Sequence, residues 1–210
     1  ICRCLAFWAG GKMNSALIII DSFIDAQLLN KISTELDTAQ LVKLDRGATD
    51  DGITFTSERY SHITKLNHVL PAHSIPNDNC PSVFQYLMPY IRKIQETIES
   101  SFNCTVFYEK DFMITPFIEG ESLDPHFDSN TDEYTILKTP NGNPKRDISS
   151  VLYLNGNYSG GEIEFINLGV KIKPRAGMLI LFPGDETYTH FVHPVTSGKR
   201  FVIPQFWALS

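Results

Sequence analysis

Residues 148–182 read ISSVLYLNGNYSGGEIEFINLGVKIKPRAGMLILF, and this stretch decides the fold class. Runs rich in β-branched, aromatic and other apolar residues at 148–154, 162–166, 170–173 and 178–182 alternate with Gly, Asn and Pro. Such runs between turn-forming residues are typical of consecutive strands. The flanking sequence adds similar runs at 105–108, 113–118, 187–192 and 201–207. Eight short strands within about a hundred residues predict a sandwich or a barrel.

The residues that precede this β-rich part predict helices. A strand over 14–20 is followed by apolar residues at helical spacing over 23–36, and Asp21 or Ser22 could cap that helix. A second amphipathic helix is predicted to begin near Pro81, because proline is favoured in the first helical turn. The sequence therefore predicts an α+β, mainly β fold with its N-terminal helices packed on one outer face of the sheet.

The chain organises as one domain over 14–210, with helical support over about 14–103 and the β-rich core over about 104–210. Residues 1–13 are interpreted as an upstream extension or a cloning remnant and are set aside. The stretch 129–146 is long, polar and rich in Asn, Asp, Thr and Pro, which favours a loop that covers a site.

Composition excludes several classes of function. The 210 residues are 42% hydrophobic and 20% charged, as in average globular proteins, and the net charge is −6 without a basic stripe. Nucleic acid is therefore not an expected partner. The longest apolar runs have five residues, so no membrane span is expected. The four cysteines form no C-x-x-C pair and are too sparse for a disulfide scaffold, which favours a reduced, cytoplasmic setting.

One short motif has the chemistry of a metal site. His126 and Asp128 stand two residues apart, so both would project from one face of a strand. Two histidines and one carboxylate on one side of a metal are typical of non-haem Fe(II) oxygenases. The second histidine would be His190 or His193, which are three apart and so cannot both reach the same ion from a regular strand.

Five blocks in order resemble the 2-oxoglutarate and Fe(II)-dependent dioxygenases, prolyl 4-hydroxylase branch. They are FIEGESLDPHFD at 117–128, SVLYLN at 150–155, GGEIEF at 160–165, PRAGMLILF at 174–182 and HFVHPVTSGKR at 190–200. The resemblance implies a double-stranded β-helix, a jelly-roll variant with iron between two sheets. It also implies that His126, Asp128 and His190 are the metal ligands and His193 is a histidine at the rim, because the family pattern sets a basic residue ten positions after the ligand.

That basic residue is Arg200. A dicarboxylate cosubstrate that binds iron through one end leaves a second carboxylate buried, and a buried charge must be paired. The resemblance implies that Arg200 binds this carboxylate and that the Tyr153 hydroxyl joins it.

Two positions depart from the family pattern. Phe117 stands where relatives often have tyrosine, and Phe206 stands in the register of the family tryptophan, with Trp207 one place later. Either a bulge shifts that strand or the pocket wall differs.

By this resemblance, the chain hydroxylates a substrate C–H bond with Fe(II), 2-oxoglutarate and dioxygen, releasing succinate and CO2, with ascorbate as a candidate reductant. The branch points to a prolyl residue in a peptide or protein. A first alternative is a hydroxylase of a free amino acid or another small metabolite. A second, of another class, is a catalytically silent jelly-roll module whose histidines hold a metal such as zinc. The intact set of His126, Asp128, His190 and Arg200 disfavours the silent module, which needs no arginine for a second carboxylate.

Overall fold

The computed structural model of the chain describes residues 2–6, 16–43, 73–108, 112–129 and 146–210. The helices are α1 (Ala26–Thr38) and α2 (Pro81–Phe102), with short 3-10 turns η2 (Asn77–Asn79), η3 (Ile166–Leu168) and η4 (Glu186–Tyr188). The strands are β1 (Cys2–Ala6), β2 (Ala16–Ile20), β3 (Val42–Lys43), β4 (His73–Ser74), β5 (Val106–Phe107), β6 (Thr115–Phe117), β7 (Leu123–His126), β8 (Ile148–Tyr153), β9 (Ser159–Gly160), β10 (Ile163–Phe165), β11 (Val170–Ile172), β12 (Leu179–Pro183), β13 (His190–Val192), β14 (Val195–Ser197) and β15 (Arg200–Leu209).

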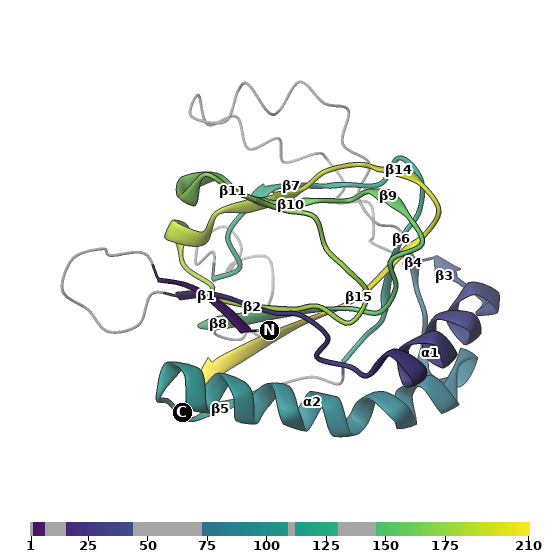
Figure 1. Cartoon of the computed structure of the whole chain (residues 1–210), viewed down its shortest axis with the longest axis horizontal. Coiled ribbons are helices and arrows are strands. Elements are labelled where there is room, and N and C mark those ends of the chain that lie inside the picture. The colour runs from purple at the N-terminus through teal and green to yellow at the C-terminus, as the bar shows by residue number, and fades with distance from the viewer. Residues whose placement is uncertain (1, 7–15, 44–72, 109–111, 130–145) are drawn as a thin grey trace, which may run out of the picture.

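The strands form two facing sheets with the helices outside the larger one. The large sheet has the order β1-β2-β12-β8-β15-β5, with β6 also paired to β15, and the small sheet has the order β11-β10-β13-β7. Two further two-stranded sheets pair β14 with β9 and β3 with β4. Figure 1 shows α1 and α2 below the large sheet and the small sheet above it. This arrangement confirms the predicted α+β, mainly β fold and the double-stranded β-helix.

Side-chain alternation along the large sheet divides the apolar residues into two cores. On β12, Leu179 and Leu181 belong to the core between sheet and helices, whereas Ile180 and Phe182 belong to the core between the two sheets. All four side chains are at most 1% exposed. A strand covered on both faces has no need of polar positions, which explains the unbroken apolar run that the sequence shows at 178–182. The inter-sheet core surrounds the candidate site.

The helices form where the sequence predicts them, with one boundary corrected. α1 is capped by Asp25, whose side chain accepts a hydrogen bond from the Leu28 backbone N–H, and not by Asp21 or Ser22. Ser22 adopts a positive φ of 55°, so the chain turns there before the helix starts. α2 begins at Pro81, as predicted. Within the described parts of the chain, no helix is long and apolar enough to cross a membrane.

Three strand predictions differ from the structure. The run at 187–192 is a strand only from His190, because its first residues complete the turn η4, which Asp185 caps. β7 ends at His126, so Asp128 lies just beyond the strand and not on it. Residues 2–6, which were expected to belong to an upstream extension or a cloning remnant, form β1 and pair with β2 over five register positions.

The departure at Phe206 and Trp207 has a simple structural form. β15 pairs with β8 in continuous register from Val202 to Trp207, so no bulge shifts this part of the strand. Trp207 is fully buried against the helices, and its indole N–H donates to the Ser150 hydroxyl at 2.9 Å. Phe206 faces the opposite side and lines the inter-sheet pocket. In this part of the strand the structure thus shows no bulge, and Phe206 is the residue that β15 contributes here to the pocket wall.

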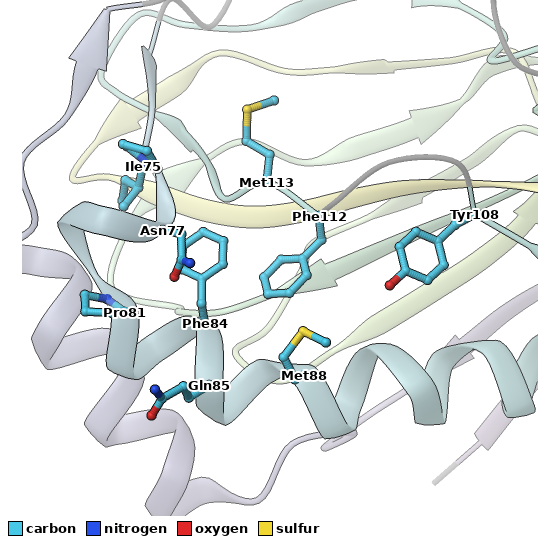
Figure 2. A pocket seen from close by; sticks show the side chains of 10 residues that line it. Ile75, Asn77, Pro81, Phe84, Gln85, Met88, Tyr108, Phe112 and Met113 are labelled. Carbon is cyan, nitrogen blue, oxygen red and sulfur yellow. The ribbon is translucent and has the colours of Figure 1, made fainter.

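A separate apolar cavity of about 520 Å³ lies beside α2. Figure 2 shows Phe84 and Met88 of α2 facing Phe112 and Met113 across it. The rings of Phe84 and Phe112 stack with centroids 4.8 Å apart. This cavity shares no lining residue with the pocket between the sheets.

The turn before β10 needs a glycine for two reasons. Gly160 has a φ of +73°, and a Cβ there would lie 2.2 Å from the Pro194 carbonyl oxygen. Because this oxygen belongs to the backbone, it cannot shift without a large cost in free energy. Gly169 has a similar φ of +64°, but nothing lies within 4 Å of a Cβ placed on it. The two positions therefore separate the cost of backbone conformation from the cost of the clash.

We expect Gly160→Ala to destabilise the protein more than Gly169→Ala. Gly169→Ala should cost about 1–2 kcal/mol for the left-handed conformation, and Gly160→Ala should lose roughly a further 1–3 kcal/mol through overpacking. Urea unfolding of the two variants and the wild type measures the difference. Equal losses would contradict the close backbone approach at Gly160.

Candidate active site

Two imidazoles lie side by side on the last two strands of the small sheet, β13 and its edge strand β7. His126 ends β7 and His190 begins β13, and the two residues are direct register partners in this antiparallel pair. Their ring centroids lie 4.4 Å apart. Strand pairing thus brings together two histidines that stand 64 positions apart in the sequence. His190 is buried, whereas the side chain of His126 is 29% exposed on the pocket side.

Backbone carbonyls determine which nitrogen of each ring is protonated. His126 Nδ1 lies 2.6 Å from the Asp124 carbonyl oxygen, and His190 Nδ1 lies 2.9 Å from the Tyr188 carbonyl oxygen. Because a carbonyl oxygen only accepts hydrogen bonds, each Nδ1 must carry the proton. The Nε2 atom of each neutral ring therefore keeps its lone pair, which is the form that binds a metal.

Asp128 completes the cluster from beyond the end of β7. Its Oδ1 lies 3.6 Å from His126 Nε2, and its Oδ2 accepts a hydrogen bond from the Ser149 hydroxyl at 2.6 Å. One donor atom from each of His126, Asp128 and His190 lies within 4.8 Å of the others. The residues that were expected to be on one strand thus come together even though β7 stops two residues early.

The electrostatics of the cluster keep His190 neutral. Burial, together with the neighbouring His126, lowers the pKa of His190 to about 4, and the Asp128 carboxylate opposes this shift only in part. A buried imidazole that stays neutral above this pH can offer a lone pair over the whole physiological range.

A pocket of about 450 Å³ opens between the sheets and contains all three side chains. Arg200 also lines it, 2% exposed, with its guanidinium carbon 4.4 Å from the centroid of the Phe117 ring. Its Nη2 donates weakly to the Tyr153 hydroxyl at 3.4 Å, while Nε and Nη1 have no hydrogen-bond partner in the described structure. No carboxylate of the described residues forms an ion pair with it, which is unusual for a buried cation.

Asn155 holds the backbone on both sides of Arg200. Its Nδ2 donates to the Lys199 carbonyl at 2.7 Å, and its Oδ1 accepts from the Phe201 N–H at 2.9 Å. The side chain is 1% exposed, so both bonds are shielded from water. Tyr153 is fully buried, and burial raises the pKa of its hydroxyl, which therefore remains a neutral donor. Asn155 lies in the quoted block SVLYLN, but nothing in its residue type announces this contact.

The residues present fit an Fe(II) ion with a dicarboxylate. Two imidazole nitrogens and a carboxylate oxygen are the donor set of non-haem iron sites. The buried guanidinium of Arg200 in the same pocket has two unpaired N–H groups, and a carboxylate can accept two parallel hydrogen bonds from them. The site therefore offers a metal-binding end and an anion-binding end within one cavity.

His193 lies away from the cluster. Its Nε2 is 2.9 Å from Glu164 Oε2, and the same carboxylate oxygen lies 2.9 Å from Lys171 Nζ. The side chains of Glu164 and His193 are 29% and 22% exposed. His193 thus takes part in a surface ion-pair group, and of the two candidate histidines only His190 is in the metal-ligand cluster.

Arg146 lines the pocket at the end of the polar stretch 129–146, and no sequence motif marks it for a role. Its guanidinium carbon lies 3.9 Å above the centroid of Phe206, and its Nε is buried without a hydrogen-bond partner in the described residues. Burial lowers the pKa of Arg146, and the nearby Asp128 opposes that shift. Residues 130–145 of the predicted loop lie outside the described residues.

Comparison with known families places the site in a known context. Residues 112–208 match the family model of the 2OG-Fe(II) oxygenase superfamily. Prolyl 3-hydroxylase 1 of Rattus norvegicus is 32% identical over 85 residues, which cover 38% of this chain and 12% of that protein. Human prolyl 3-hydroxylase 2 is 35% identical over 77 residues, covering 34% of this chain and 11% of that protein. The chain thus spans only a small part of these relatives.

Solved structures of low sequence identity have the same fold. A Trichoplax adhaerens prolyl hydroxylase in complex with a peptide fragment of the hypoxia inducible factor oxygen degradation domain matches with a TM-score of 0.60 and 18% identity, covering 93% of this chain and 84% of that chain. A Pseudomonas putida prolyl-4-hydroxylase matches with a TM-score of 0.54 and 20% identity, covering 90% of each chain.

The pKa of His190 predicts how stability of the metal-free protein depends on pH. The unfolded chain binds a proton near pH 6.5 and the folded chain only near 4, so protonation favours unfolding and stability falls as the pH drops from 6.5 to about 4. This loss should amount to about 3 kcal/mol. We expect denaturant unfolding in the presence of a chelator to show a weaker pH dependence in His190→Gln. The same dependence in both proteins would contradict a neutral buried His190.

Proposed function

We propose that this chain, whose residues 112–208 belong to the 2OG-Fe(II) oxygenase superfamily, hydroxylates a prolyl residue in a peptide or protein. The observation that carries the proposal is the cluster of His126, Asp128 and His190 in one pocket with the unpaired, buried Arg200. The prolyl hydroxylases among the relatives and structural neighbours support the substrate class.

His126, Asp128 and His190 would hold Fe(II) on one face. With 2-oxoglutarate and dioxygen bound, the iron supplies oxidation of a substrate C–H to C–OH, coupled to conversion of 2-oxoglutarate into succinate and CO2; ascorbate would serve as a reductant. The contribution of this chain is orientation. The carbonyls of Asp124 and Tyr188 accept from the Nδ1 atoms of His126 and His190, so both Nε2 atoms remain free to bind a metal. The Ser149 hydroxyl donates to Asp128 Oδ2, so Oδ1 is the carboxylate oxygen without this hydrogen bond.

Arg200 would bind the distal carboxylate of 2-oxoglutarate, with Tyr153 beside it. Because the guanidinium is fully buried and has no carboxylate partner in the described part of the chain, the bound dicarboxylate would neutralise a charge that is otherwise costly to bury. Asn155 would keep this arginine aimed at the pocket by holding the backbone at Lys199 and Phe201. The cosubstrate would therefore be oriented from both ends.

The substrate would enter beside Arg146 and Phe206. The unpaired Nε of Arg146 could donate to a peptide carbonyl, while Phe206, which lines the pocket, supplies apolar surface for a pyrrolidine ring. A peptide offers such a carbonyl on each side of a prolyl residue. This pairing of one donor with one apolar surface favours a prolyl peptide.

The test is turnover of proline-containing peptides with Fe(II), 2-oxoglutarate and ascorbate, followed by succinate formation and by mass spectrometry of the peptide. We expect His126→Ala to lose at least about 100-fold in rate, since even the loss of a supporting contact to a metal ligand costs 10–100-fold. His193→Ala is the matched control and should keep the wild-type rate, because its partner is Glu164 at the surface.

Undiminished turnover in His126→Ala would remove this residue from the ligand set. Hydroxylation of free proline or another amino acid with no activity on any peptide would replace the proposed substrate by the small-metabolite alternative. Absence of succinate with every substrate would favour the catalytically silent module.

A second variant tests the substrate contact. We expect Arg146→Leu to raise the KM for the peptide about 10-fold or more, as the loss of a hydrogen bond from a charged group costs roughly 1.5–3 kcal/mol, while 2-oxoglutarate affinity stays unchanged. Arg175→Leu is the control, because Arg175 pairs with Asp21 on the surface and lies outside the pocket. An unaltered KM in Arg146→Leu would leave the arginine without a role in substrate binding.

A further inference from the structure

Tyr158 places a second phenol beside Arg200. The residue lies in the segment between β8 and β9, and its ring meets the arginine side chain over Gly161. A Cβ on Gly161 would lie 2.8 Å from Arg200 Cδ and 3.3 Å from Tyr158 Cε2. Only a residue without a side chain lets the two groups approach at this point, and Gly161 also has a φ of +66°.

The hydroxyl of Tyr158 has no hydrogen-bond partner in the described structure although it is buried. An unpaired buried hydroxyl costs free energy, so a partner is expected from elsewhere. The strongest charge acting on it is that of Arg200, and the carboxylate of Glu162 acts more weakly. Burial raises the pKa of Tyr158 to about 12, so the phenol keeps its proton and remains a donor.

Three buried polar groups without a hydrogen-bond partner in the described structure are therefore gathered around one guanidinium. They are the Tyr158 O–H and the Nε and Nη1 groups of Arg200. Tyr153 already accepts from Nη2 on the same guanidinium. A phenol oxygen can accept from the guanidinium, as that of Tyr153 does, but the proton of the Tyr158 hydroxyl still needs an acceptor. A carboxylate accepts from several donors at once and also neutralises a cation.

We propose that Tyr158 donates a hydrogen bond to the same distal carboxylate that Arg200 binds, and that it thereby favours a dicarboxylic cosubstrate over a monocarboxylic 2-oxo acid. This inference rests on the proposed function, because it concerns the cosubstrate of that site. It assigns the loop that precedes the Gly160-Gly161 pair to cosubstrate binding. The two glycines then do more than form a turn, because Gly161 leaves the space in which the phenol and the guanidinium meet.

The experiment is calorimetric titration of the protein with Mn(II) in place of iron, so that binding is measured without turnover. The ligands are 2-oxoglutarate and 2-oxobutyrate, which shares the metal-binding end but lacks the distal carboxylate. We expect Tyr158→Phe to raise the Kd for 2-oxoglutarate about 10-fold and to change the Kd for 2-oxobutyrate less than about 2-fold. Tyr86→Phe is the matched control, because Tyr86 lies on α2 beneath Lys31 and should leave both values unchanged.

Each other result overturns the inference. An unchanged Kd for 2-oxoglutarate in Tyr158→Phe would show that the hydroxyl does not touch the carboxylate. Equal weakening of both ligands would assign Tyr158 to the general structure of the pocket, and a lowered unfolding midpoint would accompany it. If the wild type failed to bind 2-oxoglutarate at all, the proposed function would fail first, which separates that failure from a failure of Tyr158 alone.

Discussion

The structure depends on one costly feature, a guanidinium buried between two sheets with no carboxylate of the described chain to pair with it. Arg200 starts β15, the strand that also carries the buried Trp207, so the cation cannot move to solvent without loosening the large sheet. Two tyrosine phenols, the ring of Phe117 and the backbone bonds of Asn155 hold the surroundings of this charge in place. An arrangement that retains such a cost is understood most simply if an anion binds there.

The fold was largely predictable because the hydrophobic patterns of its helices and strands are clear in the sequence. The run at 178–182 is apolar at every position, and in the structure it is covered on both faces, by helices and by the second sheet. The errors fall where local pairing or capping decides. β1 forms through its pairing with β2, and η4 forms because Asp185 caps a turn, and neither effect has a periodic pattern.

The candidate site was predictable in part for a related reason. His126 and Asp128 are close in sequence, and the spacing to Arg200 favoured His190 over His193. In the structure His190 is the histidine that lies near His126 and Asp128. Arg146, Asn155 and Tyr158 carry no such mark, because their contacts depend on how separate loops approach one another. The contact between Tyr158 and Arg200 in particular requires the missing side chain of Gly161, which spacing in the sequence does not reveal.

The pairing of His126 with His190 has a consequence for the dynamics of the small sheet. β7 is the last strand of that sheet, and its pairing with β13 includes a register irregularity between His190 and Val192. A cation coordinated by both imidazoles would stabilise the pairing of β7 with β13, since any ligand that binds only the folded arrangement adds to its stability. Loss of the cation would then first increase the fraying of β7. Metal occupancy and the pairing of this edge strand with β13 would therefore be thermodynamically linked.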